Sequence, residues 1–127
     1  MFELSVRTHF SAAHHLRDYV GKCANPHGHN WMVEVAVRGT KLDKAGILID
    51  FKDLKAEMEA FLDKLDHTDL NVNPLLKGLN PTSENIARFL FEALADKFEP
   101  YGCTIHYVAM DETPDARVIY YGTKGAP

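Results

Sequence analysis

Histidines gather in the first quarter of this chain, at a spacing typical of metal ligands. Five of its seven histidines fall within residues 9–29, among them a His-Gly-His motif. In an extended segment His27 and His29 point the same way, and Gly28 lets the backbone approach what they bind. With His14 as a third nitrogen ligand, they predict a site with one open position, the arrangement of catalytic zinc. The alternative is a set of loop histidines that only form hydrogen bonds.

Cys23 precedes this motif by a few residues and admits three interpretations. Next to a metal ion or an imidazolium, its thiolate can act as a base or nucleophile. It can also be the fourth ligand of a closed structural site, or an inert thiol. The spacing does not decide between the catalytic base and the fourth ligand. Cys103 precedes an apolar stretch and is better described as a small buried hydrophobe.

Two further groups carry candidate acid–base chemistry. Asp66 precedes His67, and a neighbouring carboxylate can orient and charge an imidazole. A histidine at the C-terminal end of a helix is often only a partner of the helix dipole. Glu112 follows an apolar segment, and its carboxylate can accept two hydrogen bonds from a planar amidine-like group. From the residues alone, the structural interpretation is favoured for His67, and Glu112 fits the more common description of a solvated turn residue.

Composition limits the classes of protein to which the chain can belong. At 127 residues, 46% apolar and 25% charged, it predicts one globular domain over residues 1–127. The net charge of −4 provides no basic field for nucleic acid or an anionic membrane. No apolar stretch approaches the roughly 18 residues of a membrane span, and the N-terminal residues lack the layout of a signal peptide. We therefore expect a cytoplasmic protein with two reduced cysteines and no nucleic-acid or membrane partner.

The elements that must position these residues follow from hydrophobic periodicity. Alternation with a period of two predicts four strands, over residues 2–10, 31–38, 104–111 and 116–121. Apolar stripes predict two helices, one from Phe51 to Leu65 after the N-cap Asp50, the other ending at Phe98 after the N-cap Thr82. The order ββααββ predicts an α+β domain, with both helices on one face of a four-stranded antiparallel sheet. Such long edge strands favour pairing with another subunit.

Together these motifs resemble the 6-pyruvoyltetrahydropterin synthase family. The matching segments occur in family order and cover nearly the whole chain: FSAAHHL (10–16), CANPHGH (23–29), GILIDF (46–51), LDH (65–67), PTSEN (81–85) and ET (112–113). Three residues separate Cys23 from His27, which resembles the 6-carboxytetrahydropterin synthase branch of the queuosine (7-deazaguanine) pathway. The pyruvoyl-forming branch usually has a longer gap, and a folate-pathway branch has Glu in place of this cysteine.

The resemblance implies a fold, an assembly and a set of site residues. The fold is the tunnelling fold (T-fold), in which three subunits join their sheets into a barrel and two trimers stack into a hexamer. One zinc ion per subunit is assigned to three ligands, His14, His27 and His29. By the same resemblance Cys23 is the catalytic base, and Glu112 anchors the pterin through its 2-amino and N3 groups. Asp66 and His67 form a proton relay that reaches the site from a neighbouring subunit.

The implied reaction converts 7,8-dihydroneopterin triphosphate to 6-carboxy-5,6,7,8-tetrahydropterin, acetaldehyde and triphosphate. Zinc polarises the hydroxyls of the substrate side chain, Cys23 takes and returns protons, and Glu112 positions the ring. Magnesium can accompany the triphosphate, although the sequence does not require it. Two alternatives stay open. One is a 6-pyruvoyltetrahydropterin synthase, and the other is a non-catalytic zinc protein with Cys23 as the fourth ligand.

Overall fold

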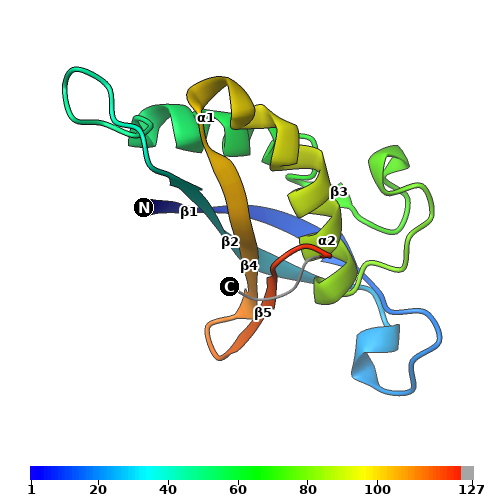
Figure 1. Cartoon of the computed structure of the whole chain (residues 1–127). Coiled ribbons are helices and arrows are strands. Elements are labelled where there is room, and N and C mark those ends of the chain that lie inside the picture. The colour runs from blue at the N-terminus through cyan, green and yellow to red at the C-terminus, as the bar shows by residue number, and fades with distance from the viewer. Residues whose placement is uncertain (124–127) are drawn as a thin grey trace.

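The computed structural model describes residues 1–123 of the chain, so the last four residues of the domain expected over 1–127 lie outside the described residues (Figure 1). The strands and helices follow one another in the order β1 (Phe2–His14), β2 (His27–Gly39), α1 (Phe51–Leu62), β3 (Thr68–Asp69), α2 (Ser83–Leu94), β4 (Thr104–Thr113) and β5 (Ala116–Tyr120). Both α-helices lie across the same face of the sheet (Figure 1). The predicted α+β architecture is therefore confirmed.

The sheet has five strands in the order β3-β1-β2-β4-β5, and not the four that the sequence predicts. The four long strands pair in antiparallel fashion, as expected. The additional strand, β3, is two residues long and runs parallel to β1 beside Ala12 and Ala13. A two-residue strand is too short to produce an alternating pattern, so periodicity does not detect it.

The first two strands extend beyond their predicted ends, into the segment expected to be a loop. The β1–β2 ladder continues until His14 pairs with His27, and His29 lies opposite Ala12. The alternation of inward- and outward-facing side chains therefore continues through the histidines. A hydrophobic pattern does not detect it because imidazole is polar. This extension makes the histidines part of the sheet.

The core lies between the sheet and the two helices. Asp50 caps α1 by accepting a hydrogen bond from Lys52 N–H (2.8 Å), and Thr82 caps α2 through Asn85 N–H (3.1 Å), as predicted. The helices end earlier than their apolar stripes, at Leu62 and Leu94. The last residues of the two stripes, Leu65 and Phe98, are nevertheless buried. The turns that follow each helix place them against the core.

The other face of the sheet carries polar and charged side chains. Asp111 on β4 bonds to Arg117 on β5 (2.7 Å) and to Arg7 on β1 (3.2 Å). These bonds, above all the one from Arg117, lower the pKa of Asp111. Tyr107 donates to Glu34 in the same network, and its pKa is raised to about 12, chiefly by burial. Charged groups thus tie the four long strands together on the face that no described helix covers.

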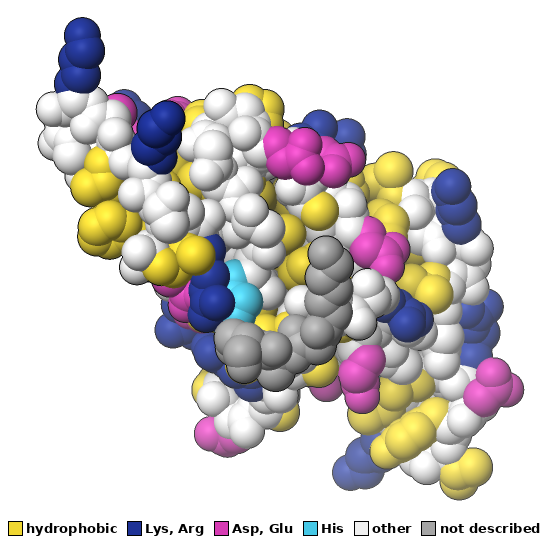
Figure 2. Space-filling model, in the orientation of Figure 1, with side chains coloured by type: hydrophobic (Ala, Val, Ile, Leu, Met, Phe, Trp, Pro, Cys, Tyr) yellow, Lys and Arg dark blue, Asp and Glu magenta, His cyan; other side chains and the backbone are white. Residues whose placement is uncertain are grey.

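Lys and Arg, Asp and Glu, and apolar side chains are interspersed over most of the face drawn in Figure 2, and several Lys and Arg side chains gather beside a histidine (Figure 2). Among the described residues, the helices are all too short or too polar to cross a membrane.

Candidate metal centre

Three histidines meet where β1 ends and β2 begins. His14 is the last residue of β1, while His27 and His29 lie on the facing strand and point to the side of the sheet that packs against the helices. Their ring centroids are 4.5, 4.8 and 5.1 Å apart, and the rings meet edge to face. Imidazoles at this separation can direct nitrogen atoms at one common point.

A carboxylate from β4 completes the cluster. Glu112 Oε1 lies 3.3 Å from His14 Nε2 and 3.2 Å from His29 Nε2. One ligand atom from each of these residues and from His27 can be chosen so that all four lie within 4.8 Å of one another. Glu112 also approaches α2, where Ser83 Oγ donates to its second oxygen (3.4 Å). The group therefore offers three nitrogen donors and one oxygen donor to a metal ion.

Backbone carbonyls set the orientation of two of the imidazoles. His14 Nδ1 lies 2.8 Å from Pro81 O, and His27 Nδ1 lies 2.7 Å from Asn25 O. A carbonyl can only accept, so in each ring Nδ1 carries the proton and Nε2 keeps its lone pair for a metal. The groups that orient these two histidines are thus main-chain oxygens, which the sequence alone does not single out.

Burial prepares the histidines for metal binding. His14 is 1% exposed, and desolvation is the main cause that lowers the pKa of His14 and of His29. Neutral imidazole is the form that binds metal. The Nε2 atoms of both rings are buried and make no hydrogen bond of good geometry, although the Glu112 oxygen is near. Two buried nitrogens without a satisfied hydrogen bond are what a metal ion would complete, so the residues fit zinc.

An indole forms the floor of the cluster. Trp31, the next inward-facing residue of β2, is fully buried and meets the rings of His14 and His29 edge to face, with centroids 4.8 and 5.1 Å away. This contact restricts the rotation of both imidazoles. The sequence predicts Trp31 only as a strand residue, and its place on the same face as His29 follows from the extension of β2 back to His27.

Cys23 lies outside the group of converging ligand atoms. It belongs to the short 3-10 turn Lys22–Ala24, is half-buried and is a free thiol. Its carbonyl accepts a hydrogen bond from Leu16 N–H (2.7 Å), which ties the turn to the end of β1. The residue that joins the three histidines is Glu112, which weighs against the closed site with Cys23 as fourth ligand. Cys103 is buried, and burial raises its pKa, in agreement with the structural interpretation.

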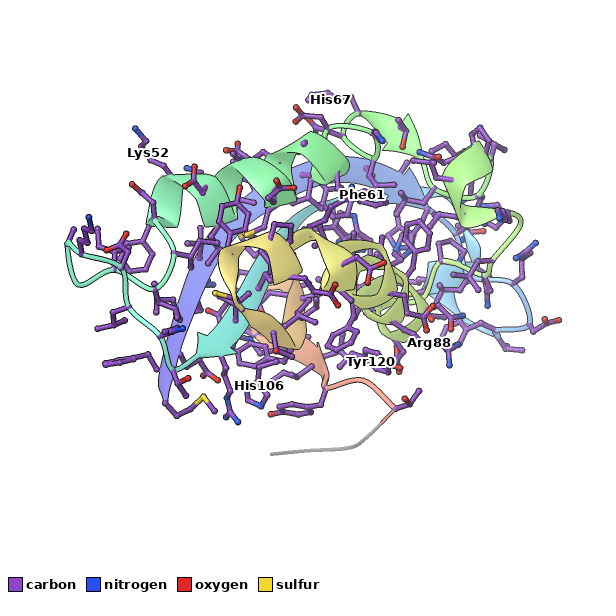
Figure 3. All side chains as sticks on the ribbon, turned by 45° about the horizontal axis from the view of Figure 1, so that its top comes forward. Lys52, Phe61, His67, Arg88, His106 and Tyr120 are labelled. Carbon is purple, nitrogen blue, oxygen red and sulfur yellow. The ribbon has the colours of Figure 1, made fainter. Side chains whose placement is uncertain are left out.

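Asp66 and His67 form a pair at the outer edge of β1. Asp66 Oδ1 accepts from Ser11 N–H (2.8 Å), and this bond is the main cause that lowers the pKa of Asp66. The other carboxylate oxygen lies 2.9 Å from His67 Nδ1. The side chain of His67 is 82% exposed and projects from the surface beyond the end of α1 (Figure 3). The structure therefore brings this pair together but does not include it in the metal cluster of the same chain.

Comparison with known proteins identifies the family. The family described as 6-pyruvoyl tetrahydropterin synthase matches residues 3–123. The chain belongs to the 6-pyruvoyl tetrahydropterin synthase family. The 6-pyruvoyl tetrahydrobiopterin synthase of Dictyostelium discoideum is 33% identical over 131 residues, covering 94% of this chain and 95% of that protein. The 6-carboxy-5,6,7,8-tetrahydropterin synthase of Bacillus subtilis is 32% identical over 131 residues, covering 98% and 88%.

The fold is that of the 6-pyruvoyl tetrahydropterin synthase family as well. The solved structure of the Caenorhabditis elegans 6-pyruvoyl tetrahydropterin synthase matches with a TM-score of 0.84 and 32% identity, and the match covers 96% of each chain. The family and the T-fold predicted from the sequence are thereby confirmed. The curated relatives are pterin synthases of two names, so similarity alone does not separate the two products.

Two hollows lie beside β2, the strand that carries the His-Gly-His motif. One, of about 590 Å³, extends from His29 and Glu112 towards Arg7 on the helix-free face. The other, of about 360 Å³, is shallower and adjoins His67. Both include Gly28, and a side chain there would meet nothing closer than Ala12 O at 3.9 Å. The larger hollow has the volume of a small-molecule site, and two residues of the candidate metal centre, His29 and Glu112, line part of it.

Proposed function

We propose that this protein is a zinc-dependent 6-carboxy-5,6,7,8-tetrahydropterin synthase. It converts 7,8-dihydroneopterin triphosphate to 6-carboxytetrahydropterin, acetaldehyde and triphosphate, in the cytoplasm and as a step of queuosine biosynthesis. The observation that carries the proposal is the convergence of three imidazoles and one carboxylate beside a hollow of small-molecule size. The family supplies the pterin chemistry, and the donor set suits zinc.

Each residue of the cluster has a role in this proposal. The three histidines hold the metal, and their Nδ1–H groups, where bonded to carbonyls, keep Nε2 free for it. Bound zinc supplies Lewis-acid polarisation of the hydroxyls on the substrate side chain. Glu112 accepts hydrogen bonds from the 2-amino and N3 groups of the pterin, which a carboxylate can do with both oxygens. The ring is thereby fixed while the substrate side chain reaches the metal.

Proton transfer is assigned to Cys23 and to the pair at the edge of β1. Cys23 takes and returns protons as the dihydropterin isomerises. His67, oriented by Asp66, is the second acid–base group and serves the site of a neighbouring subunit. The exposure of its imidazole supports this role, because a side chain that projects from the surface is free to enter a site on another copy.

The open edges of the sheet support the homo-oligomer that this role requires. β3 covers β1 only at Ala12 and Ala13, and β5 is the outermost strand on the other side. Exposed strand edges favour pairing with another chain. In the proposed assembly three copies pair edge to edge into a barrel, and two such trimers stack into a hexamer. The proposed small-molecule partner is the substrate, whose triphosphate can carry a magnesium ion.

A 6-pyruvoyltetrahydropterin synthase is the second candidate, since relatives of both names are similar to this chain to nearly the same degree. The spacing in the motif favours the carboxy product. Only three residues separate Cys23 from His27, so the thiol is tied closely to the strand that carries two of the proposed metal ligands. A short connection restricts which proton of the substrate the thiol can reach.

A product assay tests the proposal. The zinc-loaded protein is incubated with 7,8-dihydroneopterin triphosphate under reducing, anaerobic conditions, and the pterins are resolved by mass spectrometry. Carboxytetrahydropterin together with acetaldehyde is the expected result. Pyruvoyltetrahydropterin as the sole product would be consistent with the family but would contradict the assignment to the 6-carboxytetrahydropterin synthase branch. Absence of turnover with zinc still bound would favour a non-catalytic zinc protein.

A further inference from the structure

Two asparagine side chains extend the hydrogen bonding of β1 beyond its last residue. Asn71 Oδ1 accepts from His15 N–H (2.8 Å), and its Nδ2 donates to His15 O (3.0 Å). Asn80 forms the same two bonds with Arg17: its Oδ1 accepts from Arg17 N–H and its Nδ2 donates to Arg17 O, both at 3.0 Å. Each side-chain amide therefore bonds to both backbone groups of one residue, as the peptide groups of a neighbouring strand do.

Leu16 lies between His15 and Arg17, and its backbone N–H forms a hydrogen bond on the opposite side of the chain. Leu16 N–H donates to Cys23 O (2.7 Å). In an extended segment, successive residues direct their peptide groups to opposite sides. Residues 15–17 thus act as a central strand, with the two asparagines on one side and the turn of Cys23 on the other. The loops that carry these partners lie at the same end of the molecule (Figure 1).

The loop between β3 and α2, which carries both asparagines, also contacts His14. Pro81, whose carbonyl oxygen faces His14 Nδ1, directly follows Asn80. The loop is itself held at both ends, since Leu70 N–H donates to Ala13 O (2.9 Å) and Asn85 Nδ2 donates to Asn80 O (3.0 Å). One loop therefore contacts both His14 and the backbone of residues 15–17.

The turn of Cys23 depends on this support. Its internal hydrogen bonds are local, from Ala24 N–H to Gly21 O and from Asn25 N–H to Lys22 O. These bonds shape the turn, and the contact of His27 Nδ1 with Asn25 O (2.7 Å) ties its C-terminal side to β2. The bond from Leu16 ties Cys23 itself to the end of β1, and Leu16 is held on either side by residues that the asparagines bind.

We propose that Asn71 and Asn80 are positioning residues that hold the Cys23 turn beside the metal-binding histidines. The catalytic consequence rests on the proposed function, in which Cys23 is the base. A displacement of about 1 Å of a catalytic group can cost about 100-fold in rate, so loosening this turn lowers turnover without removing the metal.

The test replaces each amide with a carboxylate. In Asn71→Asp and Asn80→Asp the acceptor for the backbone N–H remains, but the donor is lost and a negative charge faces a carbonyl oxygen. We expect the Leu16 amide to exchange hydrogen at least 10-fold faster and Cys23 to react with iodoacetamide at least threefold faster. Buried Cys103 in the same chain serves as the internal reference. We also expect kcat to fall at least 10-fold, with KM and zinc content within twofold of the wild type.

Asn73→Asp is the matched control. Asn73 lies in the same loop and is only 8% exposed, but it bonds to Lys64 O, Thr68 Oγ1 and Leu75 N–H, and not to residues 15–17. It should lower Tm while leaving the Leu16 exchange, the alkylation of Cys23 and kcat within twofold. If the two test variants behave like this control, the proposal is wrong.

Two further results keep the inference separate from the proposed function and from misfolding. Faster exchange and alkylation with unchanged kcat would support the positioning of Cys23 and contradict its role as the base. Should an aspartate variant fail to fold, hydrogen exchange of the unmodified protein decides. The amides of His15, Leu16 and Arg17 should then be protected and exchange at one common rate, and an unprotected Leu16 amide would overturn the proposal.

Discussion

Glu112 Oε1 on β4 lies 3.2 Å from His29 Nε2 on the neighbouring strand β2. A carboxylate in this place can bind the metal, or it can turn towards a substrate that occupies the adjoining hollow. The two roles predict different effects when the charge is removed, since three imidazoles suffice to hold zinc in a catalytic site.

Glu112→Gln should therefore retain zinc and lose substrate recognition. Two hydrogen bonds to a charged acceptor are worth about 3 kcal/mol together, which corresponds to about a 100-fold loss in kcat/KM. Zinc content by elemental analysis and steady-state kinetics check this expectation. Loss of the metal in the glutamine variant would instead identify Glu112 as a ligand in the resting enzyme.

Cys23→Ala should abolish turnover and leave the metal in place. A general base contributes about 100- to 10,000-fold to the rate, so activity should fall by at least the lower figure. Tm and zinc content should remain those of the wild type, because the thiol is not among the converging ligand atoms. A joint loss of zinc and stability would show that the cysteine closes a structural site.

Mixing two inactive variants tests whether the site is shared between subunits. Cys23→Ala and His67→Ala should each be inactive alone, and activity should return in part after their subunits exchange. In a mixed assembly some sites combine an intact Cys23 with an intact His67 from the neighbour. Native mass spectrometry verifies the exchange, and a verified mixture without activity would contradict a site formed by two chains.

Acid should remove the stabilisation that Asp111 provides. The Arg117 hydrogen bond lowers the pKa of this carboxyl, so its contribution is fully present above the unfolded-state value of about 3.9 and disappears as pH falls through the lower folded-state value. Asp111→Asn should reduce Tm at pH 7, and its difference from the wild type should shrink below about pH 4. The exposed Asp115 on the neighbouring turn supplies the control, because Asp115→Asn should change Tm little at any pH. A difference that persists unchanged at pH 3 would contradict the ion-pair explanation.

Local sequence signals predict the elements well where side chains and backbone act over short distances. Asp50 and Thr82 act as N-caps, and the apolar stripes mark the buried faces of both helices even where the helix has already ended, except at Phe51, which is exposed. The extension of β1 and β2 through His14 and His27 escapes such signals, because polar ligands occupy inward-facing positions.

Contacts made by distant segments could not be predicted in this way. The place of Glu112 beside His29 depends on the register of β4 against β2, which no local pattern encodes. The carbonyl of Pro81 has no side-chain signature, and its contact with His14 is visible only in three dimensions. The resemblance to the family supplied the expected site residues, while the structure shows which of them meet within one chain.

The position of the histidines in one antiparallel ladder has a consequence for synthesis of the protein. All three come from β1 and β2, which form by local pairing, and a hairpin closes in about 1–10 μs. Glu112 is made 83 residues after His29 (112 − 29), which takes about 4–17 s at roughly 5–20 residues per second. The three proposed metal-binding histidines are therefore synthesised well before the carboxylate exists. Metal capture can accordingly precede completion of the fold and the joining of subunits.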